Sequence, residues 1–183
     1  FTENGHGKNI AIGYHALRTQ DAGADAFNIA IGHNAGTTIT TGVENTIIGG
    51  LAGDALTTGS GNVALGYNAL STEDAHGRNI AIGSSALTTL NAGADAYNIA
   101  IGFNAGYAVT TGLYNNLIGA NAGGALTTGT RNVAIGYNAL RTEDEHGKNV
   151  AVGHNTLYTL NAGTDAYNVA IGYDAGVSVS TGV

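Results

Sequence analysis

A five-residue phrase, an Asn followed by three mostly aliphatic or small residues and then a Gly, recurs ten times in the 183 residues of this chain. Its first copy spans residues 9–13 and its last spans residues 168–172. A fixed phrase at nearly fixed spacing is typical of a short structural unit stacked on copies of itself. We therefore expect residues 1–183 to form a single repeat array.

The spacing of the phrase has a second layer. The intervals between successive Asn positions are 19, 17, 17 and 17, and this order then repeats, so four units make one super-repeat. Super-repeats start at residues 9, 79 and 149, and the third contains only two units. Because both ends fall inside the pattern and the chain contains no Met, we interpret the sequence as a segment of a longer repetitive protein.

Composition narrows the class of protein. Gly occurs 30 times, Pro, Cys, Met and Trp are absent, and the net charge is -7 with only six Lys and Arg residues. Sequence-independent binding of nucleic acid needs clustered cations and is therefore disfavoured. The apolar runs are much shorter than the roughly 20 residues that a membrane-spanning helix needs. The sequence shows no motif for a cofactor, and we expect none.

The phrase itself predicts a short β-strand. Its first and third residues after the Asn are usually Ile, Val or Leu and its second is usually Ala, which is the period of two that strands show. We expect the Ile, Val and Leu side chains to point inward and the Ala side chains outward. The Gly that ends the phrase is expected at a tight corner. A second Ala, seven residues after most of the Asn residues, is expected to point inward at a cramped position.

A unit of this length is too short for an independent domain but long enough for one flattened coil. The sequence therefore predicts an all-β parallel β-solenoid of about ten coils. Identical Asn side chains stacked along such a coil can hydrogen-bond to one another. The predicted structural ladder consists of Asn9, Asn28, Asn45, Asn62, Asn79, Asn98, Asn115, Asn132, Asn149 and Asn168.

Residues 132–140, Asn-Val-Ala-Ile-Gly-Tyr-Asn-Ala-Leu, carry a family resemblance. They resemble the head repeats of trimeric autotransporter adhesins of the YadA type. They are also similar to the Ala-Ile-Gly-Tyr-Asn-Ala repeats of phage tail fibres and related surface proteins that end in an endosialidase-type chaperone domain. The resemblance covers nearly the whole chain. It implies a left-handed β-roll and three chains around a common axis in an extracellular fibre, on a virion tail or a bacterial surface. Because the YadA-type coil is shorter, the extra residues are expected to form outward loops.

Several recurring side chains are candidates for a chemical role. His6, His76 and His146 recur every 70 residues; they lie too far apart to share an ion within one chain, but symmetry mates in a trimer could meet. Asp25, Asp95 and Asp165 recur likewise, without the clustered oxygens that calcium requires. The adjacent carboxylates Glu73 and Asp74, like Glu143 and Asp144, are expected in solvated loops. No residue is assigned a catalytic, cofactor-binding or metal-binding role.

The column directly after the phrase Gly is the best candidate for recognition because it is rich in rings, which can stack on sugars or on a partner surface. Packing of these rings against neighbouring coils is the competing interpretation. The candidate recognition residues are Tyr14, His33, Tyr67, Phe103, Tyr137, His154 and Tyr173.

These observations predict a non-enzymatic structural fibre shaft or adhesin-type spacer. Its expected partners are copies of itself, packed as a homotrimer through the Ala face, and weakly a host-surface glycan or receptor. Two alternatives stay open. Thr pairs such as Thr57 and Thr58 are typical of ice-binding solenoids, although their position shifts between units. A tailspike-like polysaccharide-degrading enzyme would instead need carboxylates that flank a groove.

Overall fold

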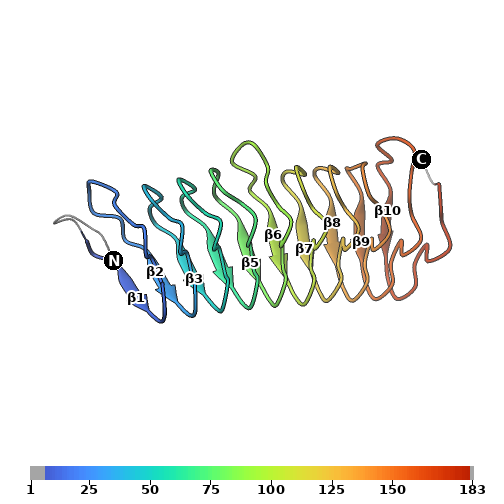
Figure 1. Ribbon diagram of the computed structural model, residues 1–183. Coiled ribbons are helices and arrows are strands. Elements are labelled where there is room, and N and C mark those ends of the chain that lie inside the picture. Colours follow the sequence, from blue (N-terminus) through green and yellow to red (C-terminus); the bar gives the residue numbers. More distant parts are fainter. Residues whose placement is uncertain (1–6, 182–183) are drawn as a thin grey trace.

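The computed structural model describes residues 7–181, which contain ten strands and are elongated along the stacking direction (Figure 1). Every strand is three residues long and occupies the three positions between the Asn and the Gly of one phrase. The strands are β1 (Ile10–Ile12), β2 (Ile29–Ile31), β3 (Thr46–Ile48), β4 (Val63–Leu65), β5 (Ile80–Ile82), β6 (Ile99–Ile101), β7 (Asn116–Ile118), β8 (Val133–Ile135), β9 (Val150–Val152) and β10 (Val169–Ile171).

The ten strands form one parallel sheet in sequential order, with equivalent positions of neighbouring coils paired in register. A coil is the unit that starts at one phrase Asn and ends before the next. The predicted all-β parallel β-solenoid of about ten coils is therefore confirmed. The two additional residues of the longer coils lie in loops opposite the sheet, and Figure 1 shows the loop between β5 and β6 rising above its neighbours.

The predicted orientation of the strand side chains is wrong. From β2 to β9 the middle residue of each strand is buried, as with Ala30, Ala64 and Ala100, whereas the residues on either side are exposed or half-buried. The interior of the coil is narrow and also contains the second Ala column, so the strand contributes one inward side chain per coil. It is Ala in most coils, and it is Ile47 or Leu117 in two coils where Gly53 or Gly123 leaves room for it. The inward position expected for that second Ala column is confirmed, since Ala35 and Ala69 are fully buried.

The outward residues of the strands form a mostly apolar surface, which we call the aliphatic stripe. It consists of the first and third residues of each strand. Ile or Leu fills the third position in every strand except β9, where Val does, and the first position is Ile or Val in every strand except β3 and β7, where it is Thr46 and Asn116. Exposure is greatest near the two ends, reaching 58% for Ile12 and 70% for Ile171. The Ala column cannot pack against another chain, because it is buried within this one.

The core alternates between two packing patterns. In the coils of β1, β4, β5, β8 and β9, a Leu follows the second Ala column and is buried, as with Leu70 and Leu87. In the other coils a Gly replaces it. A Cβ on Gly123 would lie 2.7 Å from Leu117 and from Leu126, so the missing side chain makes room for large ones. Where one column has Gly instead of Leu, larger side chains from other columns fill the space, so the interior stays densely packed.

The Gly that ends each phrase is required by both conformation and space. Gly102 has a φ of 137°, and a Cβ there would lie 2.6 Å from the backbone carbon of Gly119 in the next coil. Gly83 is similar, with a φ of 130° and its Cβ position 2.5 Å from the Gly102 oxygen. Backbones of successive coils therefore meet directly at this corner.

We predict that Gly102→Ala lowers the free energy of unfolding by about 2 kcal/mol or more, because the strained φ and the backbone overlap add. Gly163→Ala is the matched control, since a Cβ at Gly163 would meet no atom within 4 Å; it should change stability by less than about 0.5 kcal/mol. Thermal unfolding followed by circular dichroism measures both. Equal melting temperatures for the two variants would contradict the close approach at the corner.

Candidate functional site

The phrase Asn residues form a buried ladder that connects each coil to the next. The side-chain Oδ1 of Asn98 accepts a hydrogen bond of 2.9 Å from the backbone N–H of Asn115, and Asn45 does the same for Asn62 at 2.9 Å. These side chains are fully buried from Asn28 to Asn149. Buried amides with satisfied partners stabilise a fold and are not free to react.

The side-chain Nδ2 of most phrase Asn residues donates a hydrogen bond to a backbone carbonyl in the loop on the far side of the coil. Asn98 Nδ2 donates to the Gly112 carbonyl at 2.8 Å, and Asn115 Nδ2 donates to the Gly129 carbonyl at 2.8 Å. In two coils the acceptor is the carbonyl of His76 or of His146, each at 3.3 Å. Contacts from amide to amide also occur, as from Asn45 to Asn28 at 3.1 Å. The ladder therefore ties strand, next coil and loop together.

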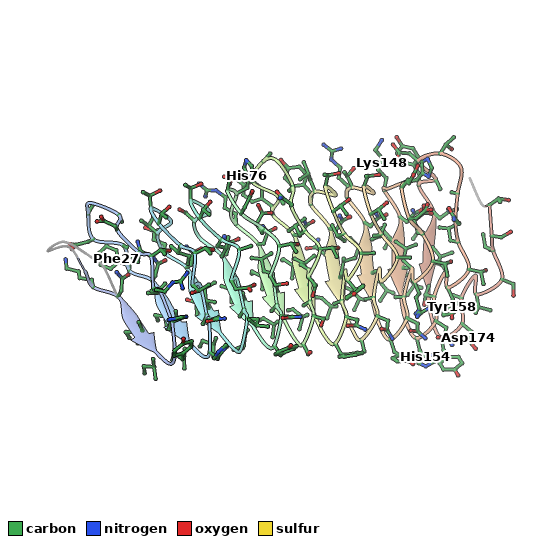
Figure 2. All side chains as sticks on the ribbon, in the orientation of Figure 1. Phe27, His76, Lys148, His154, Tyr158 and Asp174 are labelled. Carbon is green, nitrogen blue, oxygen red and sulfur yellow. The ribbon has the colours of Figure 1, made fainter. Side chains whose placement is uncertain are left out.

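The candidate recognition column is exposed, and several of its rings stack on one another. The Tyr137 and His154 ring centroids are 5.2 Å apart, and those of His154 and Tyr173 are 4.9 Å apart (Figure 2 labels His154). Tyr14 stacks on His33 in the same way at 5.3 Å. The stacked rings are nearly parallel and remain at least half exposed where they are Tyr, with Tyr173 at 75%.

Tyr67 and Phe103, the remaining rings of this column, are each 57% exposed. Small residues of the same column, Gly50, Ser84 and Ala120, lie in the coils beside them. The column is therefore an exposed row of rings with gaps rather than a closed pocket, and recognition by it stays a prediction.

A second exposed column was missed from the sequence. It lies one residue before the phrase Asn and brings cations over aromatic rings. Arg78 lies 5.7 Å from the centroid of Tyr97, which stacks on Tyr114, and Arg131 covers Tyr114 at 5.6 Å. Lys148 lies 4.9 Å from the centroid of Tyr167. The sequence contains the signal for this column. A Lys or Arg directly before one phrase Asn is followed by an aromatic residue directly before the next phrase Asn, as with Arg78 and Tyr97.

The recurring Asp residues form ion pairs with the Lys and Arg residues of this column. Asp25 pairs with Lys8 at 2.6 Å, Asp95 with Arg78 at 2.7 Å, and Asp165 with Lys148 (labelled in Figure 2). Hydrogen bonds from Arg78 and from the Gly77 N–H lower the pKa of Asp95. Because these carboxylates bind side-chain cations, they serve as surface cross-links between coils.

The loops at His76 and His146 bring acidic residues and an imidazole together. Glu73, Asp74 and His76 each offer a ligand atom within 4.8 Å of the others, and Glu143, Asp144 and His146 repeat the arrangement. The expectation of solvated carboxylates is wrong for Glu73 and Glu143, which are fully buried. The reason is their position: they occupy the inward column that Leu90 fills in the next coil.

Both Glu carboxylates are held by backbone N–H groups. Glu73 Oε1 accepts from His76 N–H at 3.2 Å and Oε2 from Ala92 N–H at 3.3 Å. Burial raises the pKa of Glu73, and these two hydrogen bonds, with the charge of His76, oppose the rise. The pKa of Glu143 is raised by burial in the same way. His6, the third recurring His, lies outside the described residues, and a meeting of symmetry-related His residues stays a prediction.

Comparisons with family models, with curated proteins and with solved structures find no match to this chain. The residues that the structure describes include no helix long and apolar enough to cross a membrane. Function therefore has to be argued from the geometry of the array.

We predict that Asn98→Ala lowers the free energy of unfolding by about 3 kcal/mol, because it leaves the Asn115 N–H and the Gly112 carbonyl without their buried partners. Chemical denaturation measures the loss. Asn91→Ala is the control, since Asn91 is exposed, and should cost less than about 0.5 kcal/mol. A loss of similar size in the control would argue against the ladder.

The buried Glu residues predict a pH dependence. A carboxyl whose pKa is raised on folding makes the folded state less stable as pH rises from the unfolded value of 4.5 through the folded value. The double variant Glu73→Gln, Glu143→Gln should therefore lose less stability over that pH range than the native chain. Melting temperatures measured with EDTA present test this. The exposed Glu145→Gln should follow the native profile, and parallel profiles for all three proteins would refute the prediction.

Proposed function

We propose that this chain is a segment of the shaft of an extended extracellular fibre, on a phage tail or a bacterial surface, and acts as a stiff spacer. The observation that carries the proposal is the uninterrupted register of ten coils along one sheet. Each coil is bonded to the next through backbone and ladder hydrogen bonds, and the ion pairs of Lys8, Arg78 and Lys148 add a surface link every 70 residues. The resemblance of residues 132–140 to fibre repeats supports the same function.

The aliphatic stripe supports self-association as part of this function. Ten coils at about 4.8 Å each make a stripe on the order of 48 Å long. A long exposed surface of mostly apolar side chains marks an interaction site. A second and third copy of the chain would present the same stripe, so a closed homotrimer would cover all three. The seam is therefore the Ile and Val face and not the Ala face expected from the sequence.

The side-chain hydroxyls of the Thr residues favour a fibre over an ice-binding surface. Thr89 Oγ1 donates to the carbonyls of Tyr107 and Val109 in the next coil, at 2.7 and 3.0 Å. Thr57 Oγ1 and Thr127 Oγ1 donate to the carbonyls of Asp74 and Asp144 at 2.8 and 2.9 Å. These hydroxyls cross-link coils, and a thermal-hysteresis assay is expected to show no activity.

An enzyme that degrades polysaccharide needs two carboxylates that flank a substrate groove. The paired carboxylates of this chain are adjacent on one loop, and Glu73 and Glu143 bond to backbone N–H groups inside the coil. A role as a non-enzymatic spacer fits this arrangement better. Incubation with host polysaccharide is expected to release no oligosaccharide.

Sedimentation equilibrium tests the self-association. We predict a mass three times that of the 18.2 kDa chain, and dissociation to monomer in the double variant Ile82→Lys, Ile101→Lys, because charges at the centre of the stripe cannot be buried unpaired. Asn91→Lys, on an exposed loop away from the strands, should remain a trimer. A native chain that is monomeric at all concentrations would overturn the proposed seam, and circular dichroism checks that the variants fold.

A further inference from the structure

The strongest unexplained feature of the molecule is the unpartnered imidazole nitrogen in each of two loops. The Nδ1 atoms of His76 and His146 are buried and make no hydrogen bond. Each faces a carboxylate oxygen, Glu73 Oε1 at 3.6 Å and Glu143 Oε1 at 3.8 Å. These separations are too long for hydrogen bonds. A buried polar atom without a partner calls for an explanation.

The separations match those of two ligands on one metal ion. Donor atoms bound about 2.0–2.1 Å from a tetrahedral ion lie roughly 3.4 Å from each other. A small rotation of the imidazole brings His76 Nδ1 and Glu73 Oε1 to that spacing. Asp74 adds a carboxylate oxygen, so that each of the three residues offers one ligand atom within 4.8 Å of the others. Solvent can supply a fourth ligand, because the His76 side chain is 31% exposed.

The backbone around these side chains is held in place on both sides. The Asn62 amide binds the His76 carbonyl at 3.3 Å, and Asp95 Oδ1 accepts from the Gly77 N–H at 3.0 Å. The carbonyl of Asp74 accepts from Thr57 Oγ1 at 2.8 Å. Glu73 is oriented by its two backbone N–H donors, as carboxylate ligands of metals usually are. The cluster is therefore preorganised by contacts that do not depend on an ion.

The same arrangement occurs twice in different local sequences. His146 lies one super-repeat after His76, and the flanking residues differ, with Ser71 and Ala75 in one loop and Arg141 and Glu145 in the other. Both clusters nevertheless have a buried Glu, a second carboxylate and an unpartnered Nδ1.

We propose that Glu73, Asp74 and His76 bind a divalent transition-metal ion, and that Glu143, Asp144 and His146 bind a second. Imidazole with carboxylates suits Zn²⁺ and similar ions, whereas Ca²⁺ and Mg²⁺ prefer all-oxygen sets with more ligands. Binding an ion neutralises the buried carboxylate and gives Nδ1 a partner. The ion joins the loop to the core once in each of the two complete super-repeats. This inference stands independently of the proposed fibre function.

Zn²⁺ titration of the EDTA-stripped chain by calorimetry tests the proposal. The double variant His76→Ala, His146→Ala should bind two fewer Zn²⁺ ions per chain than the native protein, or bind them at least tenfold more weakly. His154→Ala is the matched control and should bind as the native chain does. The Nδ1 of His154 is also buried and unpartnered, but it faces a single carboxylate, Asp174, at 3.8 Å; Figure 2 labels this pair.

A measurement on the native chain keeps the test independent of folding of the variants. On addition of Zn²⁺, the imidazole NMR signals of His76 and His146 should shift in a saturable way, while those of His15, His33 and His154 should not. Glu73→Gln should remove the shift of His76 alone. Zn²⁺ uptake that is equal in the native chain and the double His variant, or shifts spread evenly over these five His residues, would overturn the proposal.

Discussion

The hydrogen bond that the backbone N–H of each phrase Asn donates to the side-chain Oδ1 of the preceding phrase Asn is the interaction on which the rest of the array depends. Between Asn115 N and Asn98 Oδ1 it is 2.9 Å long, and it is formed in a fully buried position. It fixes where each new coil starts relative to the last. The same amide bonds the loop that closes its coil, so strand register and loop position are set by one side chain. Shifting a strand by one residue would break both contacts and would expose the inward column.

The glycine corner limits how this stacking can be achieved. At Gly102 and Gly119 the backbones of two successive coils contact each other directly, with no space for a Cβ. Side chains therefore cannot determine the spacing at that corner, and the ladder four residues earlier does so instead. The columns further round the coil are free to vary in volume, as the alternation of Leu70 with Gly53 shows. The spacing between coils is fixed at the Gly corner, while the size of the buried side chains varies from coil to coil. Both are possible together because each coil contacts mainly its two neighbours.

Much of this could be predicted from the sequence, for a physical reason. Strand, ladder, corner and the second Ala column each repeat at a fixed position, and repetition in sequence becomes stacking in space. The orientation of the strand could not be read in the same way. Both faces of a strand such as β6, with Ala100 between Ile99 and Ile101, are apolar, so period two identifies a strand without telling which side is inside. The width of the closed coil decides which face of the strand is inside, and that width depends on the side chains of every column of the coil.

The candidate sites were harder to predict because they join residues from different columns. The cation over a ring, as with Arg78 and Tyr97, involves one residue from each of two coils. Burial of Glu73 depends on its being aligned with Leu90, which a local reading of an acidic loop does not reveal. An ionisable side chain in a column otherwise filled by Leu, Ile, Val and one Gln is an exception to the repeat, and the exception itself recurs one super-repeat later at Glu143. Placing it there lowers the stability of a nearest-neighbour array at regular points. An ion bound to these two Glu residues would offset the cost of burying their charge and would raise the stability of the array at those points.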